Sequence, residues 1–191
     1  AGTIFLALIL ACGLFIAIPT FAAKFLHEIT DSPMILNLAE GFLRLIIFLA
    51  YIFAISQTKD MQRVFQYHGA EHKTIFCYES DLPLTVANVR KFPRLHPRCG
   101  TAFLLIVMIV SIFVFAFLGW PDLWLRILSR IILLPVVAGI AYEVIRFAGR
   151  SKNPLVHLAI MPGLWLQYLT TREPDDSMIE VAITSLEAVQ K

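Results

Sequence analysis

Residues 3–23, TIFLALILACGLFIAIPTFAA, form an apolar run that contains no charged side chain. A bilayer core is about 30 Å thick, and a helix that rises about 1.5 Å per residue needs about 20 apolar residues to cross it. A secretory signal has a basic leader and a shorter apolar segment, and neither is found here. We therefore predict that residues 3–23 form a transmembrane helix.

Three further runs have the same character and cover residues 35–55, 102–118 and 123–147. Hydrophobic residues make up 58% of the chain and its mean hydropathy is +0.74, whereas soluble domains are roughly 45–50% apolar. The sequence thus predicts an all-α polytopic membrane protein with four transmembrane helices in a lipid bilayer. Residues 155–169 are too few to span and contain Pro162-Gly163, so we interpret them as a re-entrant or interfacial segment.

The distribution of positive charge predicts the orientation of these helices. Residues 57–101 contain seven Lys and Arg residues against four Asp and Glu residues, whereas residues 24–33 contain one Lys and residues 119–122 contain no cation. Because cytoplasmic loops are enriched in Lys and Arg, residues 57–101 are predicted to be cytoplasmic. Arg150 and Lys152 return the chain to that side, so both termini are expected in the cytoplasm.

The chain therefore divides into five predicted parts. The last, residues 173–191, reads as a cytoplasmic amphipathic helix in which Ser177 and Glu180 form a capping box. Its apolar face must dock on the protein itself or on a neighbouring subunit, and we expect a homo-oligomer. The other parts are two transmembrane helices (1–56), a polar loop (57–101), two more transmembrane helices (102–149) and the re-entrant or interfacial segment (150–172).

Charged residues also fall inside the predicted transmembrane helices. Glu40 and Arg44 are four residues apart, so they share a helix face and can neutralise each other. Glu143 and Arg146 lie near the end of the fourth run. These residues either line an internal polar path or form compensated structural pairs.

The polar loop contains a cluster typical of metal sites. His68, Glu71 and His72 give the pattern H-x-x-E-H, in which a helical segment would place both imidazoles on one face. Two imidazoles at this spacing can chelate a divalent ion, and the carboxylate can act as a ligand or as a general base. As an alternative, Glu71 pairs with a basic residue of the loop and the histidines are ordinary polar residues.

A second cluster follows in the same loop, where His96 and Cys99 are separated by two residues in the sequence His96-Pro97-Arg98-Cys99-Gly100. Thiols remain reduced in the cytoplasm and are available to metal there. Together with His68 and His72, these residues complete a tetrahedral donor set that suits Zn²⁺. If all four residues bind, the site is closed and structural; if one is free, water takes the open position and Glu71 is the candidate catalytic base.

Four segments in order resemble the bacterial membrane family typified by YqhQ, a domain-of-unknown-function family whose members are described as predicted metal-dependent enzymes. The resemblance runs through nearly the whole chain, and it implies a bacterial inner membrane protein; the family's N-terminal extension is missing from this sequence. Where the family usually has an acid after residue 86, this chain has Ala87-Asn88. The four segments are YHGAEHKT at residues 67–74, HPRCGT at 96–101, YEVIR at 142–146 and LTTREPDD at 169–176.

Three classes of function remain open from the sequence. The leading hypothesis is a zinc-dependent membrane enzyme, most plausibly a hydrolase, with its site at the cytoplasmic face. The first alternative is an oligomeric ion channel or transporter in which the metal is structural and the intramembrane charges line a path. The second is a membrane scaffold without catalysis. No feature of the sequence points to nucleic acid.

Overall fold

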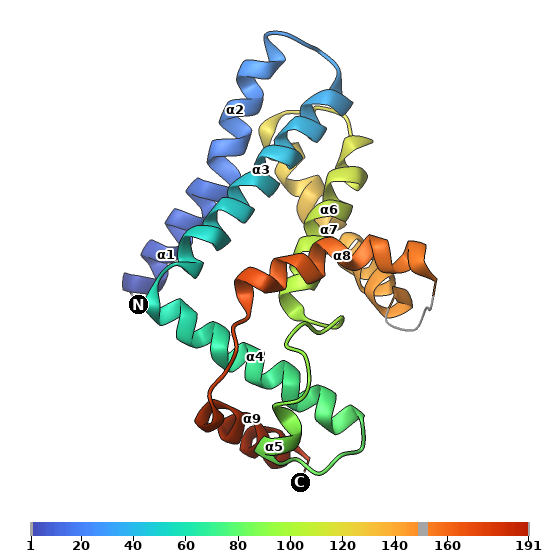
Figure 1. The fold of residues 1–191 in the computed structure, drawn as a ribbon. Coiled ribbons are helices and arrows are strands. Elements are labelled where there is room, and N and C mark those ends of the chain that lie inside the picture. The colour runs from blue at the N-terminus through green and yellow to red at the C-terminus, as the bar shows by residue number, and fades with distance from the viewer. Residues whose placement is uncertain (1, 149–152, 191) are drawn as a thin grey trace. The chain divides into compact units, whose positions relative to one another are not determined.

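The computed structural model describes residues 2–148 and 153–190, and within them every regular element is helical (Figure 1). This confirms the predicted all-α class. The chain forms two compact units, each built from two separate stretches of sequence. The first unit comprises Ala1–Tyr51 and Ile106–Val144, and the second comprises Ile52–Leu105 and Ile145–Lys191. Arg150 and Lys152, which we used to predict orientation, lie outside the described residues.

Three helices are long and apolar enough to cross a membrane. The first is a 26-residue helix, Gly2–His27, made of α1 (Gly2–Cys12), a π-helical turn η1 (Gly13–Ala17) and α2 (Ile18–His27). The others are α3 (Pro33–Ser56) and α7 (Leu123–Ala148). Most of their large apolar side chains are exposed, as expected of helices that face lipid.

The fourth predicted span is an apolar helix, α6 (Gly100–Ala116), but it has only 17 residues. At about 1.5 Å per residue it extends about 26 Å, a little less than a typical hydrocarbon core. Residues 117 and 118, which we included in this span, lie in the turn that follows α6. Among the described residues, three helices therefore qualify as membrane spans by length and composition, and α6 is a shorter apolar helix.

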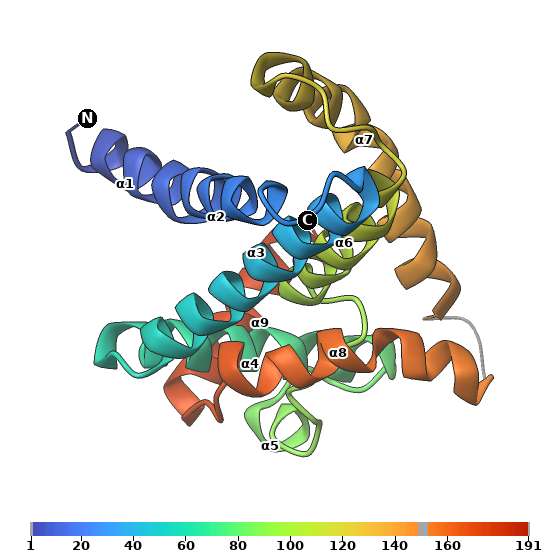
Figure 2. The same ribbon diagram turned by 90° about the horizontal axis from the view of Figure 1, so that it is seen from above.

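In the first unit, α3 lies beside α6 (Figures 1 and 2). A Cβ built on Gly41 of α3 would lie 2.7 Å from Cγ1 of Ile112 in α6, so only glycine permits this close approach. Asn37 donates a hydrogen bond to the carbonyl of Leu118 at 3.0 Å. Figure 2 shows α1 and α2 on one side of this pair and α7 on the other.

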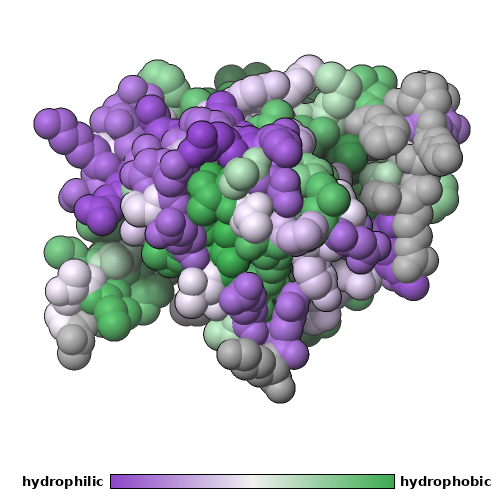
Figure 3. Space-filling model, turned by 60° about the horizontal axis from the view of Figure 1, so that its bottom comes forward, coloured by the Kyte–Doolittle hydropathy of each residue, from purple (hydrophilic) through white to green (hydrophobic). Residues whose placement is uncertain are grey.

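The second unit differs most from the prediction, because the expected loop at residues 57–101 is largely helical. Lys59–Glu79 form the 21-residue helix α4, and Val86–Val89 form the short helix α5. The helix α4 is amphipathic and buries a face that includes Phe65, Ala70 and Cys77. Figure 3 shows that the face of the molecule formed by α4, α5 and α9 is mostly hydrophilic, with hydrophobic side chains in its centre.

Two helices from the end of the chain complete this unit. The helix α8 (Pro154–Thr170) continues through Pro162, where we expected a break. A Cβ on Gly163 would lie 2.9 Å from Cβ of Ala102, so the glycine allows α8 to approach the start of α6 closely. Pro162 thus lies inside a continuous helix, and Gly163 serves packing.

The last helix, α9 (Asp176–Val189), is the predicted amphipathic tail. Its apolar face docks on the same chain: Met178, Ile179 and Ile183 form a core cluster with residues of α4 and α5. The cap differs from the prediction, because Asp175 is the N-cap and accepts a hydrogen bond from the backbone N–H of Met178 at 3.0 Å. Ser177 instead donates its hydroxyl proton to Asp175.

Candidate metal centre

Three of the four predicted ligands come together in the second unit. His68 and His72 lie one turn apart on α4, and Cys99 immediately precedes α6. One ligand atom from each residue lies within 4.8 Å of the other two. Sγ of Cys99 is 3.3 Å from Nε2 of His68, and the two imidazole centroids are 4.3 Å apart.

Both histidines present Nε2 to this cluster because Nδ1 is engaged elsewhere. Nδ1 of His68 lies 2.7 Å from the carbonyl oxygen of Thr170, and Nδ1 of His72 lies 2.5 Å from that of Arg94. A carbonyl oxygen only accepts, so each Nδ1 carries a proton, and Nε2 is the nitrogen that offers a lone pair when the ring is neutral. This arrangement is typical of metal-binding histidines, whose second nitrogen donates to a backbone carbonyl or a carboxylate.

The surroundings of Cys99 favour the thiolate form of its side chain. Burial opposes its ionisation, but hydrogen bonds from His68, His72, Thr101 and the backbone of Ala102 outweigh that effect and lower the pKa of Cys99 to about 4. Cys99 also stands at the N-terminus of α6, where the helix dipole favours negative charge. The thiolate is the form of cysteine that binds metal.

The contact with Cys99 also changes the pKa of His68. Burial works against its charged form, yet the hydrogen bonds to Cys99 and to the carbonyl of Thr170, with the nearby charges of Cys99 and Glu71, raise the pKa of His68. These shifts favour a thiolate on Cys99 and a protonated ring on His68. A bound cation would take the place of the imidazolium proton.

His96, the fourth predicted ligand, lies next to the cluster and is not part of it. Its ring centroid is 5.7 Å from that of His72, and its Nδ1 accepts a hydrogen bond from the backbone N–H of Arg98 at 3.2 Å. Neutral His96 therefore carries its proton on Nε2, which has no lone pair for a metal in this tautomer. That buried Nε2 has no hydrogen-bond partner among the described residues and lies 3.6 Å from Oε2 of Glu79. Burial lowers the pKa of His96, which keeps the ring neutral.

Glu71, the predicted base, lies at the edge of the site. It is exposed, and it lines a groove of about 410 Å³ between α4 and α9 together with Tyr67 and Val181. The structure thus separates Glu71 from the three ligand atoms while leaving it close enough to influence His68. No salt bridge joins Glu71 to Lys73 or Arg98 in the described part of the chain, because those residues pair with Glu173 and Glu79.

The sequence did not identify several residues that position the ligands. Gln167 of α8 is fully buried and holds the backbone of His96 from both sides: its Oε1 accepts from the N–H at 2.7 Å and its Nε2 donates to the carbonyl at 2.8 Å. Arg94 donates to the carbonyl of Thr171 at 2.7 Å. These bonds fix the segment that carries Cys99 against the end of α8.

The segment after α8 is fixed to α4 in turn. The N–H of Arg172 donates to the carbonyl of Phe65 at 2.8 Å, and a Cβ on Gly69 would lie 2.1 Å from the carbonyl oxygen of Arg172. Lys73 is 4% exposed and forms an ion pair with Glu173. The tail motif at residues 169–176 therefore belongs to the site, although its residues offer no ligand to the cluster.

The donor set fits a metal ion. Zinc binds sulfur at about 2.3 Å and imidazole nitrogen at about 2.0–2.1 Å, which places tetrahedral S and N ligands about 3.5 Å apart. The distance of 3.3 Å between Sγ of Cys99 and Nε2 of His68 is close to this spacing, and the cluster combines one cysteine with two imidazoles. Within the described residues, no fourth His, Cys, Asp or Glu lies within 4.8 Å of all three ligand atoms.

The predicted intramembrane residues divide into two groups. The side chain of Glu40 is buried in the first unit, where its Oε1 pairs with Arg44 at 2.6 Å as expected and also with Arg130 at 2.6 Å, a partner that we did not predict. Glu143 and Arg146 are exposed near the end of α7 and do not belong to this group.

Comparison with known proteins places the chain in a family. It matches the family described as "Protein of unknown function (DUF1385)" over residues 1–191. It is 47% identical to "Uncharacterized protein YqhQ" of Bacillus subtilis (strain 168) over 171 residues, which cover 87% of this chain and 54% of that protein. The chain thus spans about half the length of this relative. No solved structure matches it. The chain belongs to the DUF1385 family of proteins of unknown function.

Proposed function

We propose that His68, His72 and Cys99 hold a zinc ion and that the protein is a metal-dependent membrane enzyme, most plausibly a hydrolase. The proposal includes the predicted topology, with α6 as a fourth span, both chain termini in the cytoplasm and the metal centre at the cytoplasmic face of a bacterial inner membrane. The orientation rests on the excess of Lys and Arg in residues 57–101.

One observation carries the metal proposal: three ligand atoms lie within 4.8 Å of one another, and both imidazoles are held with Nε2 toward the thiolate. The carbonyls of Thr170 and Arg94 favour the tautomer that leaves Nε2 for a metal, as in known metal-binding histidines.

The ligand count favours catalysis over a structural role. Catalytic zinc sites have three protein ligands and an open position, whereas structural sites have four. The tautomer of His96 keeps it out of the ligand set, so the cluster provides three ligands. A zinc ion in such a site supplies Lewis acidity and activates water at neutral pH. Glu71 is the carboxylate that we assign as general base.

Metal analysis of the purified full chain tests the first part. We expect about one zinc per chain, and Cys99→Ala should reduce this at least tenfold. Cys77→Ala is the matched control, since Cys77 is buried in the same unit but hydrogen-bonds only to backbone carbonyls of Leu82 and Pro83. A wild-type protein without stoichiometric metal would contradict the proposal.

Glu71→Gln tests the second part. The variant should keep its metal but lose at least a hundredfold in the hydrolysis of chromogenic esters or phosphoesters by the wild-type protein in detergent. Glu187→Gln, an exposed residue of α9, is the control. Full activity of Glu71→Gln would exclude Glu71 as the base and leave the metal site standing.

A second function is favoured by the 3.3 Å contact between Cys99 and His68 and by the low pKa of Cys99. A thiolate beside an imidazolium is also the arrangement of cysteine nucleophiles, which form a covalent acyl intermediate without metal. Alkylation by iodoacetamide distinguishes a metal centre from a cysteine nucleophile. In a metal centre, the protein as purified resists alkylation of Cys99 until a chelator removes the metal; in a nucleophile, Cys99 is alkylated at the same rate with and without chelator.

A further inference from the structure

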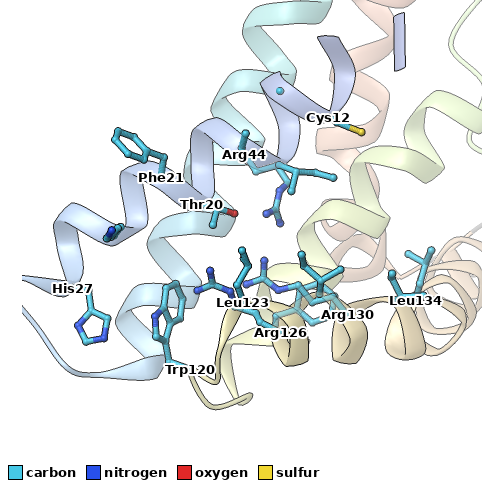
Figure 4. Close-up of a pocket in the computed structure, with 17 residues that line it drawn as sticks. Cys12, Thr20, Phe21, His27, Arg44, Trp120, Leu123, Arg126, Arg130 and Leu134 are labelled. Carbon is cyan, nitrogen blue, oxygen red and sulfur yellow. The ribbon is translucent and has the colours of Figure 1, made fainter. Parts of the chain in front are cut away.

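The first unit contains a cavity of about 1030 Å³ that no part of the proposed metal chemistry uses. Its walls come from η1 and α2 on one side and from α7 on the other. Figure 4 shows the side chain of Arg44 beside Thr20, with those of Arg126 and Arg130 below them, and all three arginines extend into the same space. The cavity is therefore apolar in its walls and strongly basic at one place.

The positive charge there exceeds what the described residues neutralise. Glu40 accepts from Nη2 of Arg44 and from Nη1 and Nη2 of Arg130. Arg126 is only 9% exposed and stacks on Trp120, with its guanidinium carbon 4.1 Å from the ring centroid. Within the described part of the chain no carboxylate forms a salt bridge with Arg126, so three guanidiniums face one carboxylate.

Uncompensated charge is costly in this setting. Charged residues inside transmembrane segments normally pair with each other or line polar cavities, because the hydrocarbon around them does not solvate charge. The cation–π contact with Trp120 offsets only part of the cost. An anion in the cavity would complete the pairing.

The remaining walls indicate what kind of anion fits. Ile16, Ile131 and Leu134 line the cavity and are 51%, 61% and 55% exposed, so an apolar path leads from the arginines along helices that are long enough to span a membrane. A small inorganic anion would leave that path empty. An anion that carries a hydrocarbon chain would occupy both the basic site and the apolar path.

We propose that this cavity binds a phospholipid with an anionic headgroup, whose phosphate is held by Arg126 and the Arg44–Arg130 group and whose acyl chain lies along α7. Guanidinium groups bind phosphate oxygens through two parallel hydrogen bonds, which a single ammonium does not offer. The inference is independent of the metal centre, since every residue that it uses lies in the first unit.

The test uses the purified full chain in neutral detergent, with dioleoyl phosphatidylglycerol as the probe. We expect phosphatidylglycerol to raise the midpoint of thermal unfolding, and phosphatidylcholine to raise it by less than half as much. Arg126→Gln should lose at least half of the response to phosphatidylglycerol while being as stable as wild type, or more stable, without lipid. Arg63→Gln, which removes an exposed charge on α4, should respond as the wild type does.

A second measurement does not depend on any variant. Phosphatidylglycerol with a photoactivatable acyl chain should cross-link to peptides from residues 12–27 or 123–134 of the wild-type chain. Equal responses to the two lipids, cross-links confined to other helices, or an Arg126→Gln protein with a full response would each overturn the proposal. Glycerol phosphate that stabilises as well as the lipid does would also overturn it, because the ligand would then be a free phosphate.

Discussion

The main polar cluster of each unit is held by different means. In the first unit, Glu40 is held by other side chains, Arg44 and Arg130, and the walls around them are apolar. In the second unit, His68 and His72 are held by backbone carbonyls at the ends of neighbouring segments. Charge compensates charge in one unit, whereas backbone geometry selects tautomers in the other.

This difference has a consequence for stability and for ligands. Side-chain ion pairs in apolar surroundings are strongly destabilised when one partner is lost, because the other charge remains buried. A site oriented by backbone bonds depends instead on the packing that brings the segments together. Changes in the first unit should therefore act on folding, and changes in the second should act on metal affinity as well.

The largest effect is expected from Glu40→Gln. Arg44 and Arg130 would lose their shared carboxylate, and removal of one partner from a buried ion pair costs about 3–5 kcal/mol. Unfolding by sodium dodecyl sulfate in mixed micelles would measure this loss. Glu28→Gln, at an exposed position, should change stability little. A loss below about 1 kcal/mol would show that water or lipid already solvates the cluster.

Gln167→Leu should have the next largest effect and should act on the metal. The substitution leaves the N–H and the carbonyl of His96 buried without partners, which costs about 1–3 kcal/mol for each group. The segment that carries Cys99 would shift, and loss of such supporting contacts typically weakens metal binding about 10–100-fold. Competition with a chelator measures the affinity. Gln190→Leu, at the exposed end of α9, is the control.

Gly69→Ala tests the packing on which the second unit depends. The new methyl group would meet the backbone carbonyl of Arg172, which cannot move aside as a side chain can, and overpacking of this kind costs about 1–3 kcal/mol. Gly139→Ala in α7 is the matched control, since nothing lies within 4 Å of its Cβ position. Equal stability of the two variants would show that the tail segment is not closely packed on α4.

The smallest effect is expected from Glu173→Gln. It breaks an ion pair as Glu40→Gln does, but the side chain of Glu173 is 64% exposed and Lys73 also donates to the carbonyl of Arg90 at 3.2 Å. Partly exposed pairs contribute about 0–1 kcal/mol. Limited proteolysis of the tail would detect a change. A loss as large as that of Glu40→Gln would contradict the contrast between the units.

Much of the fold followed from the sequence because its signals are local. Long apolar runs predicted α3 and α7 to within a few residues, since helix length and hydrophobicity alone satisfy the backbone in a membrane. The spacing of His68 and His72 placed them on one helix face for the same local reason. The polar composition of residues 57–101 predicted a loop. The helix α4 forms there instead because it buries its apolar face against elements that are distant in sequence.

The sequence by itself determined the helical class, the apolar spans and the residue types of the metal cluster. Only the tertiary structure decided which residues meet. It placed Cys99 against His68, gave His96 the tautomer that leaves it outside the ligand set, and brought Arg130 to Glu40. The reason is physical: spacing along a chain determines which side chains share a face, whereas hydrogen bonds between distant segments determine where lone pairs point and which charges are neutralised.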